Sequence, residues 1–102
     1  MKTQKPMPPV HPGEILREDF LEPMGVTGYR LAKATGMPIQ RVSAIVNEKR
    51  SITADTALRL GRFFGVDPQW WMNMQVYFDL ETARRELGER LAAEVSPMAK
   101  AS

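Results

Sequence analysis

Five side chains between residues 40 and 47 have the chemistry and spacing needed to read DNA bases. They are small, amide or guanidinium groups that a helix would place on or beside one outward face: Gln40, Arg41, Ser43, Ala44 and Asn47. In the major groove Gln can pair with adenine and Arg with guanine, and an alanine methyl can approach the methyl group of thymine. The segment therefore predicts a base-reading surface.

Residues suited to phosphate oxygens border this candidate base-reading segment. Lys49, Arg50 and Thr53 follow it in the sequence, and Thr27 begins the preceding helix. Such side chains, like the starts of helices, bind phosphate without reading base sequence. We therefore assign these four residues, together with the five above, to a DNA-binding site.

The distribution of charge also indicates an anionic partner. Residues 28–50 carry five basic side chains and one acidic side chain, a net charge of +4, whereas the flanking segments 1–27 and 51–102 each have a net charge of −1. A basic block in a chain whose overall charge is only +2 favours nucleic acid first and an acidic protein second. The alternative is a solvated helix face beside a basic loop.

The composition argues against catalysis. The 102 residues include no cysteine and one histidine, which excludes cysteine-ligated zinc, a thiol nucleophile and multi-histidine metal sites. We interpret His11 as the start of a helix, because it directly precedes Pro12. The sequence predicts no enzyme, no metal and no cofactor. Since no apolar run reaches membrane-spanning length, we expect a cytoplasmic protein without a membrane partner. The expected DNA binding would make it nucleoid-associated.

Helices must position these residues, and the sequence predicts an all-α fold. Proline at helix starts, threonine at N-caps and glycine after helix ends divide the chain into segments with apolar residues at helical spacing. Pro23 should stop the first helix, and Gly88 should weaken the last. The expected helices cover residues 12–22, 27–36, 38–48, 53–65 and 67–79, with helix continuing or restarting from residue 80.

The second and third of these helices predict a helix-turn-helix. Ala32 lies where the two helices would come closest, and Gly36 can make the turn between them. The second helix needs an apolar face to hold it against the domain. That inward face is expected to comprise Ile39, Val42, Ile45 and Val46.

The rest of the chain divides into an arm, an extension and a tail. We expect an extended N-terminal arm at 1–10, the helix-turn-helix domain at 11–66, a helical dimerisation extension at 67–95 and a tail at 96–102. Within the extension we assign Trp70, Trp71 and Met74 to dimerisation. Adjacent tryptophans on a helix point about 100° apart, so a small domain has difficulty burying both. The alternative is that this run is ordinary core.

Three consecutive segments resemble one known family, the HigA/VapI-type antitoxins of the XRE/Cro-like helix-turn-helix class. They are HPGEILREDF (11–20), LAKATGMPIQRVSAIVNEKRSITADTALRLGRFFG (31–65) and PQWWMNMQVYFDL (68–80). The resemblance implies a five-helix, phage-repressor-like DNA-binding domain, to which the apolar pattern of the chain adds the C-terminal helical extension. It also implies a homodimer, a cognate HigB-like toxin that cleaves mRNA, and repression of the shared operon.

We therefore expect an antitoxin that binds double-stranded operator DNA and neutralises an RNase toxin. An RNase that grips mRNA should be basic, so the toxin-binding surface is expected at the arm and at Glu14, Glu18 and Glu22 on the first helix. Two alternatives remain open at this point. One is a free-standing transcriptional repressor, and the other is a toxin inhibitor that does not bind DNA.

Overall fold

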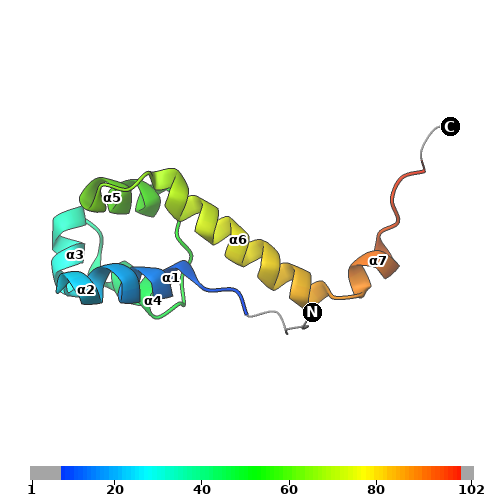
Figure 1. Ribbon diagram of the computed structural model, residues 1–102, viewed down its shortest axis with the longest axis horizontal. Coiled ribbons are helices and arrows are strands. Elements are labelled where there is room, and N and C mark those ends of the chain that lie inside the picture. Colours follow the sequence, from blue (N-terminus) through cyan, green and yellow to red (C-terminus); the bar gives the residue numbers. More distant parts are fainter. Residues whose placement is uncertain (1–7, 100–102) are drawn as a thin grey trace, which may run out of the picture.

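The computed structural model describes residues 8–99, and this part of the chain is helical without strands (Figure 1). The prediction of an all-α fold is therefore confirmed. The elements are α1 (Pro12–Ile15), η1 (Leu16–Leu21), α2 (Glu22–Met24), α3 (Gly28–Thr35), α4 (Ile39–Val46), α5 (Ala54–Phe64), α6 (Pro68–Leu87) and α7 (Arg90–Glu94).

The first helix continues past the proline that was expected to stop it. The elements α1, η1 and α2 follow one another without a break, and α2 ends only at Gly25, whose φ is 65°. The middle element is a π-helix, in which Glu22 N–H bonds to the carbonyl of Arg17. A π turn is wider than an α turn, so the ring of Pro23 is accommodated where an α turn would crowd it. The predicted stop at Glu22 and Pro23 was wrong for this reason.

The other helix boundaries agree with the sequence signals. The Thr27 hydroxyl accepts a hydrogen bond from Arg30 N at 3.0 Å, and the Thr53 hydroxyl accepts one from Thr56 N at 3.4 Å. Gly36 follows α3 in the left-handed conformation that ends a helix. Of the two alternatives after Asp79, the structure shows continuation, because α6 runs unbroken until Gly88.

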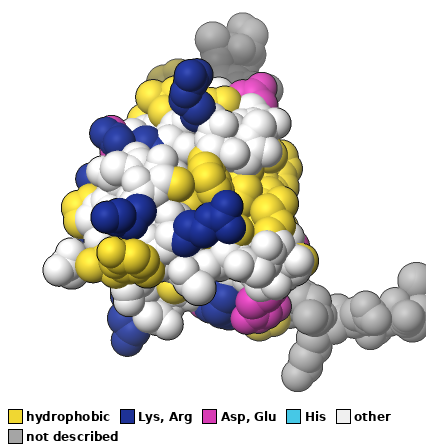
Figure 2. Space-filling model, turned by 90° about the vertical axis from the view of Figure 1, so that its left-hand side faces the viewer, with side chains coloured by type: hydrophobic (Ala, Val, Ile, Leu, Met, Phe, Trp, Pro, Cys, Tyr) yellow, Lys and Arg dark blue, Asp and Glu magenta, His cyan; other side chains and the backbone are white. Residues whose placement is uncertain are grey.

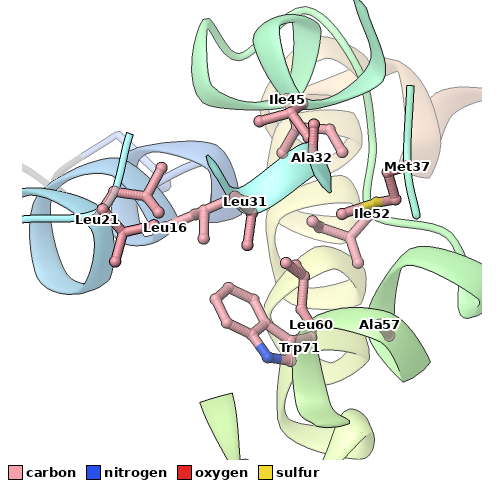
Figure 3. Close-up of a cluster of buried hydrophobic side chains, with 12 residues drawn as sticks. Leu16, Leu21, Leu31, Ala32, Met37, Ile45, Ile52, Ala57, Leu60 and Trp71 are labelled. Atoms are coloured by element: carbon pink, nitrogen blue, oxygen red, sulfur yellow. The ribbon is translucent and has the colours of Figure 1, made fainter. Parts of the chain in front are cut away.

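One apolar cluster joins all the longer helices. Figure 3 shows Trp71 of α6 and Leu60 of α5 at one end of the cluster and Ile45 of α4 at the other. Trp71 is 0% exposed, so the start of α6 belongs to the same core as the helix-turn-helix. The first helix packs closely on α4 at Gly13, where a Cβ atom would lie only 1.8 Å from the Ile45 carbonyl oxygen.

The second half of α6 leaves this core. The buried residues of α6 are Trp71 and Gln75, both in its first half, and α7 has none. In Figure 1, α6 runs away from the other helices toward α7. Although α6 is long, neither it nor any other helix in the described range is apolar enough to cross a bilayer.

Candidate nucleic-acid interface

The helices α3 and α4 meet as a helix-turn-helix. Val42 and Ile45 are buried beneath α4, as predicted, and Ala32 is buried on α3 facing the same cluster. The packing at the start of α3 is close as well, because a Cβ atom on Gly28 would lie 3.5 Å from Val42 Cγ1. With its inner side held in this way, α4 presents its opposite side to solvent.

The outer side of α4 forms a shallow hollow of about 610 Å³. Four of the predicted base-reading residues line it, and the predicted phosphate ligand Lys49 lies at the same place. The hollow also includes Ile39, which was predicted to belong to the inward face. The lining residues are Ile39, Gln40, Ser43, Ala44, Asn47 and Lys49.

Ile39 corrects the predicted inward face. It is 41% exposed, whereas Val42 and Ile45 are buried and Val46 is half-buried. Ile39 is the first residue of α4, directly after Pro38. Helical spacing placed it at the edge of the apolar face, but at this end of the helix the core does not extend alongside it. The hollow therefore combines an aliphatic side chain with amide and hydroxyl groups.

Arg41 lies apart from the hollow and is held by α5. Its guanidinium Nη1 is 2.6 Å from Asp55 Oδ2, and Arg59 Nε donates to the same oxygen at 2.9 Å. These two hydrogen bonds, that of Arg41 above all, hold the pKa of the Asp55 carboxyl below its usual value. Arg59 also donates to the carbonyl of Thr35 at 2.8 Å, which ties α5 to the end of α3. Nothing in the sequence pattern pointed to this arrangement of Arg41.

Arg17 of the first helix contacts the C-terminal end of α4. Its guanidinium donates to the carbonyl of Val46 and also lies 3.5 Å from the carboxylate of Glu48. Glu48 is the acidic side chain of the basic block, so this ion pair offsets its negative charge. The φ of Glu48 is 62°, which turns the chain out of the helix. After this turn Lys49 N–H donates a hydrogen bond to the carbonyl of Ala44 at 2.8 Å. This turn orients the backbone that carries Lys49 and Arg50, both of which are exposed.

A buried glutamine that was not expected from the sequence holds the other end of the same loop. Gln75 of α6 accepts a hydrogen bond from Ile52 N–H at 2.7 Å through its Oε1, and its Nε2 donates to Asp79 at 2.9 Å. Ile52 is itself buried. Gln75 lies four residues after Trp71, on the same side of α6. A polar residue on the buried side of a helix is the sequence signal that could have indicated this role. The loop with the predicted phosphate ligands is thus anchored from both sides.

The charge on the neighbouring surface fits an anionic partner. Figure 2 views the molecule from the end where α3 lies, and Lys and Arg side chains are spread over this face while the visible acidic ones lie mainly near its edges. Arg30 and Lys33 of α3 are exposed, and Lys33 Nζ lies 5.7 Å from the ring centre of Tyr29. The predicted positive block is therefore largely on the outside of the fold.

Comparisons with known proteins agree on one family. The helix-turn-helix family profile matches residues 18–71. Virulence-associated protein I of Dichelobacter nodosus is 55% identical over 80 residues, which make up 78% of this chain and 74% of that protein. Antitoxin HigA-1 of Vibrio cholerae is 39% identical over 90 residues, which make up 88% of this chain and 84% of that protein.

A solved structure gives the same result. Antitoxin HigA of Pseudomonas aeruginosa, solved with the higBA promoter, is similar at a TM-score of 0.86 and 42% identity, covering 89% of this chain and 99% of that one. This chain belongs to the HigA family of helix-turn-helix antitoxins. The family predicted from the three sequence segments is thereby confirmed, and with it the phage-repressor-like fold.

The two tryptophans of the antitoxin have different environments. Trp71 is enclosed by the core, so it cannot form part of a contact surface. Trp70 is 39% exposed and, with Met74 and the exposed Tyr77, lines an apolar groove of about 820 Å³ between α6 and the arm residues 8–10. The predicted dimerisation set therefore loses Trp71 and retains Trp70 and Met74 as candidates.

The acidic residues assigned to toxin binding lie on the first helix of the antitoxin. Glu18 and Glu22 are exposed, whereas Glu14 is half-buried, and Glu18 is paired with Arg17 at 3.1 Å. Of the arm, residues 1–7 lie outside the described part of the chain.

Proposed function

We propose that this antitoxin represses its own operon as a homodimer whose two α4 helices enter successive major grooves of a palindromic operator. The supporting observation is the solvent-exposed hollow on α4, bordered by the loop of Lys49 and Arg50, in a chain similar to an antitoxin solved with a promoter. Successive major grooves on one face of the duplex would place the half-sites about 34 Å apart, one turn of the DNA helix. Repression would follow from occlusion of the promoter, without catalysis.

Within this proposal the site residues have two distinct roles. Gln40, Ser43, Ala44 and Asn47 would contact base edges, while Lys49 and Arg50 would contact phosphates. The N-cap threonines Thr27 and Thr53 would add phosphate contacts at the starts of α3 and α5. Arg41 would contribute charge from its position beside Asp55, and a contact to guanine would require it to leave that carboxylate.

Paired substitutions separate the two roles. Gln40→Ala should weaken operator binding by about 1–3 kcal/mol and relax the preference for operator over random DNA. Lys49→Ala should weaken binding to both DNAs alike and reduce the salt slope by about one unit. Titrations of operator and scrambled duplexes at several salt concentrations measure both effects. Equal losses on both duplexes for Gln40→Ala would show that α4 is not the base reader.

Dimerisation is proposed through the groove beside α6. Trp70, Met74 and Tyr77 present apolar surface that the described part of the chain leaves open to solvent. A second copy of the chain would cover this surface and bring a second α4 to the DNA. The separate role of Trp71 in the core offers a direct control.

We further propose that the antitoxin neutralises a basic, HigB-like RNase through a surface other than α4. The exposed carboxylates Glu18 and Glu22 of the first helix, with Glu14 beside them, offer negative charge to such a partner. In cells that carry the toxin gene, Gln40→Ala combined with Lys49→Ala should derepress the promoter and still permit growth. Charge reversal at Glu18 and Glu22 should leave the promoter repressed but fail to neutralise the toxin, so that growth stops. If cells with the α4 double variant stopped growing although they contained as much antitoxin as cells with the natural protein, the two surfaces would overlap.

A further inference from the structure

Ile39 is an exposed aliphatic residue within an otherwise polar reading surface. It is 41% exposed and lines the hollow on α4 with Gln40, Ser43 and Ala44. Residues 39 and 43 are one helical turn apart, as are 40 and 44, so the hollow lies between two short rows of side chains. Its lining therefore combines the aliphatic groups of Ile39 and Ala44 with an amide and a hydroxyl.

We infer that Ile39 is a specificity-determining residue that contacts the 5-methyl group of a thymine in the operator. This inference rests on the proposed binding of operator DNA by α4. Thymine is the base that presents an apolar group in the major groove, and apolar side chains recognise it by contact. Ile39 is the first residue of α4, and the N-terminal residues of a recognition helix are those that reach the base edges.

The surroundings of Ile39 favour DNA over an apolar protein partner. Lys49 lines the same hollow, and the exposed Arg50 follows it, so an occupant would lie beside positive charge. The carboxylate nearest in sequence, Glu48, is paired with Arg17. A duplex would supply a methyl group for the hollow and phosphates for the basic rim, whereas an aliphatic protein surface would leave the charges at that rim without partners.

Replacing thymine with deoxyuridine tests the contact, because it removes the methyl group and leaves every hydrogen-bonding group of the base in place. Operator duplexes substituted at one thymine per half-site would be titrated with the full-length protein and with Ile39→Ala. At one position we expect the substitution to weaken binding by the natural protein about three- to tenfold. For Ile39→Ala the same substitution should change affinity less than twofold, because the partner of the methyl group is already missing.

Leu58→Ala provides a matched control. Leu58 is an exposed aliphatic residue on α5 that does not line the hollow, so this variant should respond to deoxyuridine as the natural protein does. Equal responses of the natural protein and Ile39→Ala at every thymine would overturn the inference while leaving operator binding by α4 intact. If the natural protein bound operator and random DNA equally well, the proposed function would be overturned, and the inference with it. Circular dichroism of both variants verifies that they are folded.

Discussion

At the scale of single residues, the tightest steric constraint on α4, the proposed DNA-reading helix, lies on its neighbour α1. Gly13 approaches the backbone of α4 so closely that a Cβ atom would lie 1.8 Å from the Ile45 carbonyl oxygen. Backbone cannot rotate aside as a side chain can, so an added methyl group must push α1 away from α4. The position of α4 therefore depends on the absence of one side chain on its neighbour.

Gly13→Ala is expected to destabilise the antitoxin by about 1–3 kcal/mol or more, since the overlap is with backbone. Gly28→Ala is the matched control, because its Cβ would meet Val42 Cγ1 at an ordinary 3.5 Å. That control should remain within about 1 kcal/mol of the natural protein, because alanine fits at this position and restricts the unfolded chain. Urea unfolding followed by circular dichroism measures both. Similar losses for the two variants would contradict the close packing at Gly13.

His11 should give the fold a pH dependence. Its Nδ1 accepts a hydrogen bond from Gly13 N–H at 2.8 Å, and its ring packs against Phe78. Burial lowers the pKa of His11 below 6.5, although Glu48 and Asp79 oppose this shift. The unfolded chain therefore binds a proton at a higher pH than the folded protein does. The free energy of unfolding should accordingly fall as the pH drops below 6.5 toward the folded pKa.

His11→Asn isolates this contribution, because asparagine can still accept the hydrogen bond at the start of α1 but does not titrate in this range. The pH dependence of unfolding between about pH 7.5 and 5.5 should be flatter in the variant than in the natural protein. An NMR titration of the single histidine gives its folded pKa directly. A value at or above that of the unfolded chain would exclude the predicted effect.

At the scale of elements, the sequence predicted what is decided locally. The hydroxyl of an N-cap such as Thr27 and the backbone of a left-handed glycine such as Gly36 act within a few residues of their own position, so the ends of α3 and α5 could be predicted. The direction of a side chain at the end of a short helix depends on what lies beside it in space. For that reason Ile39 was placed inward, and the link from Arg41 to Asp55 was missed.

The loop between α4 and α5 depends on a hydrogen bond that Ile52 N–H donates to Gln75 of α6. Gln75→Leu should leave the buried N–H of Ile52 without an acceptor, which costs about 1–3 kcal/mol. Since this loop carries Lys49 and Arg50, DNA affinity should also fall. Gln69→Ala is the control, because Gln69 is an exposed residue of the same helix whose amide donates to Asn73 at 2.9 Å. Urea unfolding and DNA titration of both variants check the difference, and equal behaviour would contradict this role of Gln75.

At the scale of the whole molecule, α6 connects the core with the proposed dimer contact. Trp71→Ala should cost about 3–5 kcal/mol of stability, because its indole is fully buried. Tyr77→Ala removes a side chain that is 62% exposed and lines the groove, so it should leave the fold intact and weaken self-association. Trp70→Ala should act in the same direction, with some loss of stability because its ring also packs against Phe20.

Sedimentation across a range of concentrations measures the association of these variants. Leu58→Ala is the control for removing an exposed apolar residue away from the groove, and it should associate as the natural protein does. A natural protein that remains monomeric at micromolar concentration and still binds operator normally would contradict the dimer. Unchanged association in both Trp70→Ala and Tyr77→Ala would place the contact elsewhere.

The adjacent tryptophans give this antitoxin two fluorophores in opposite environments. Trp71 is shielded from water, so it should emit at shorter wavelength than Trp70, and its emission should shift to the red only when the core opens. Trp70 remains accessible to a collisional quencher such as iodide until another molecule covers it. The centres of the two indole rings lie only 5.0 Å apart, so each ring influences the emission of the other. Variants with a single tryptophan are therefore needed to separate their signals. Unfolding and assembly could then be followed in one unlabelled chain by emission wavelength and by quenching.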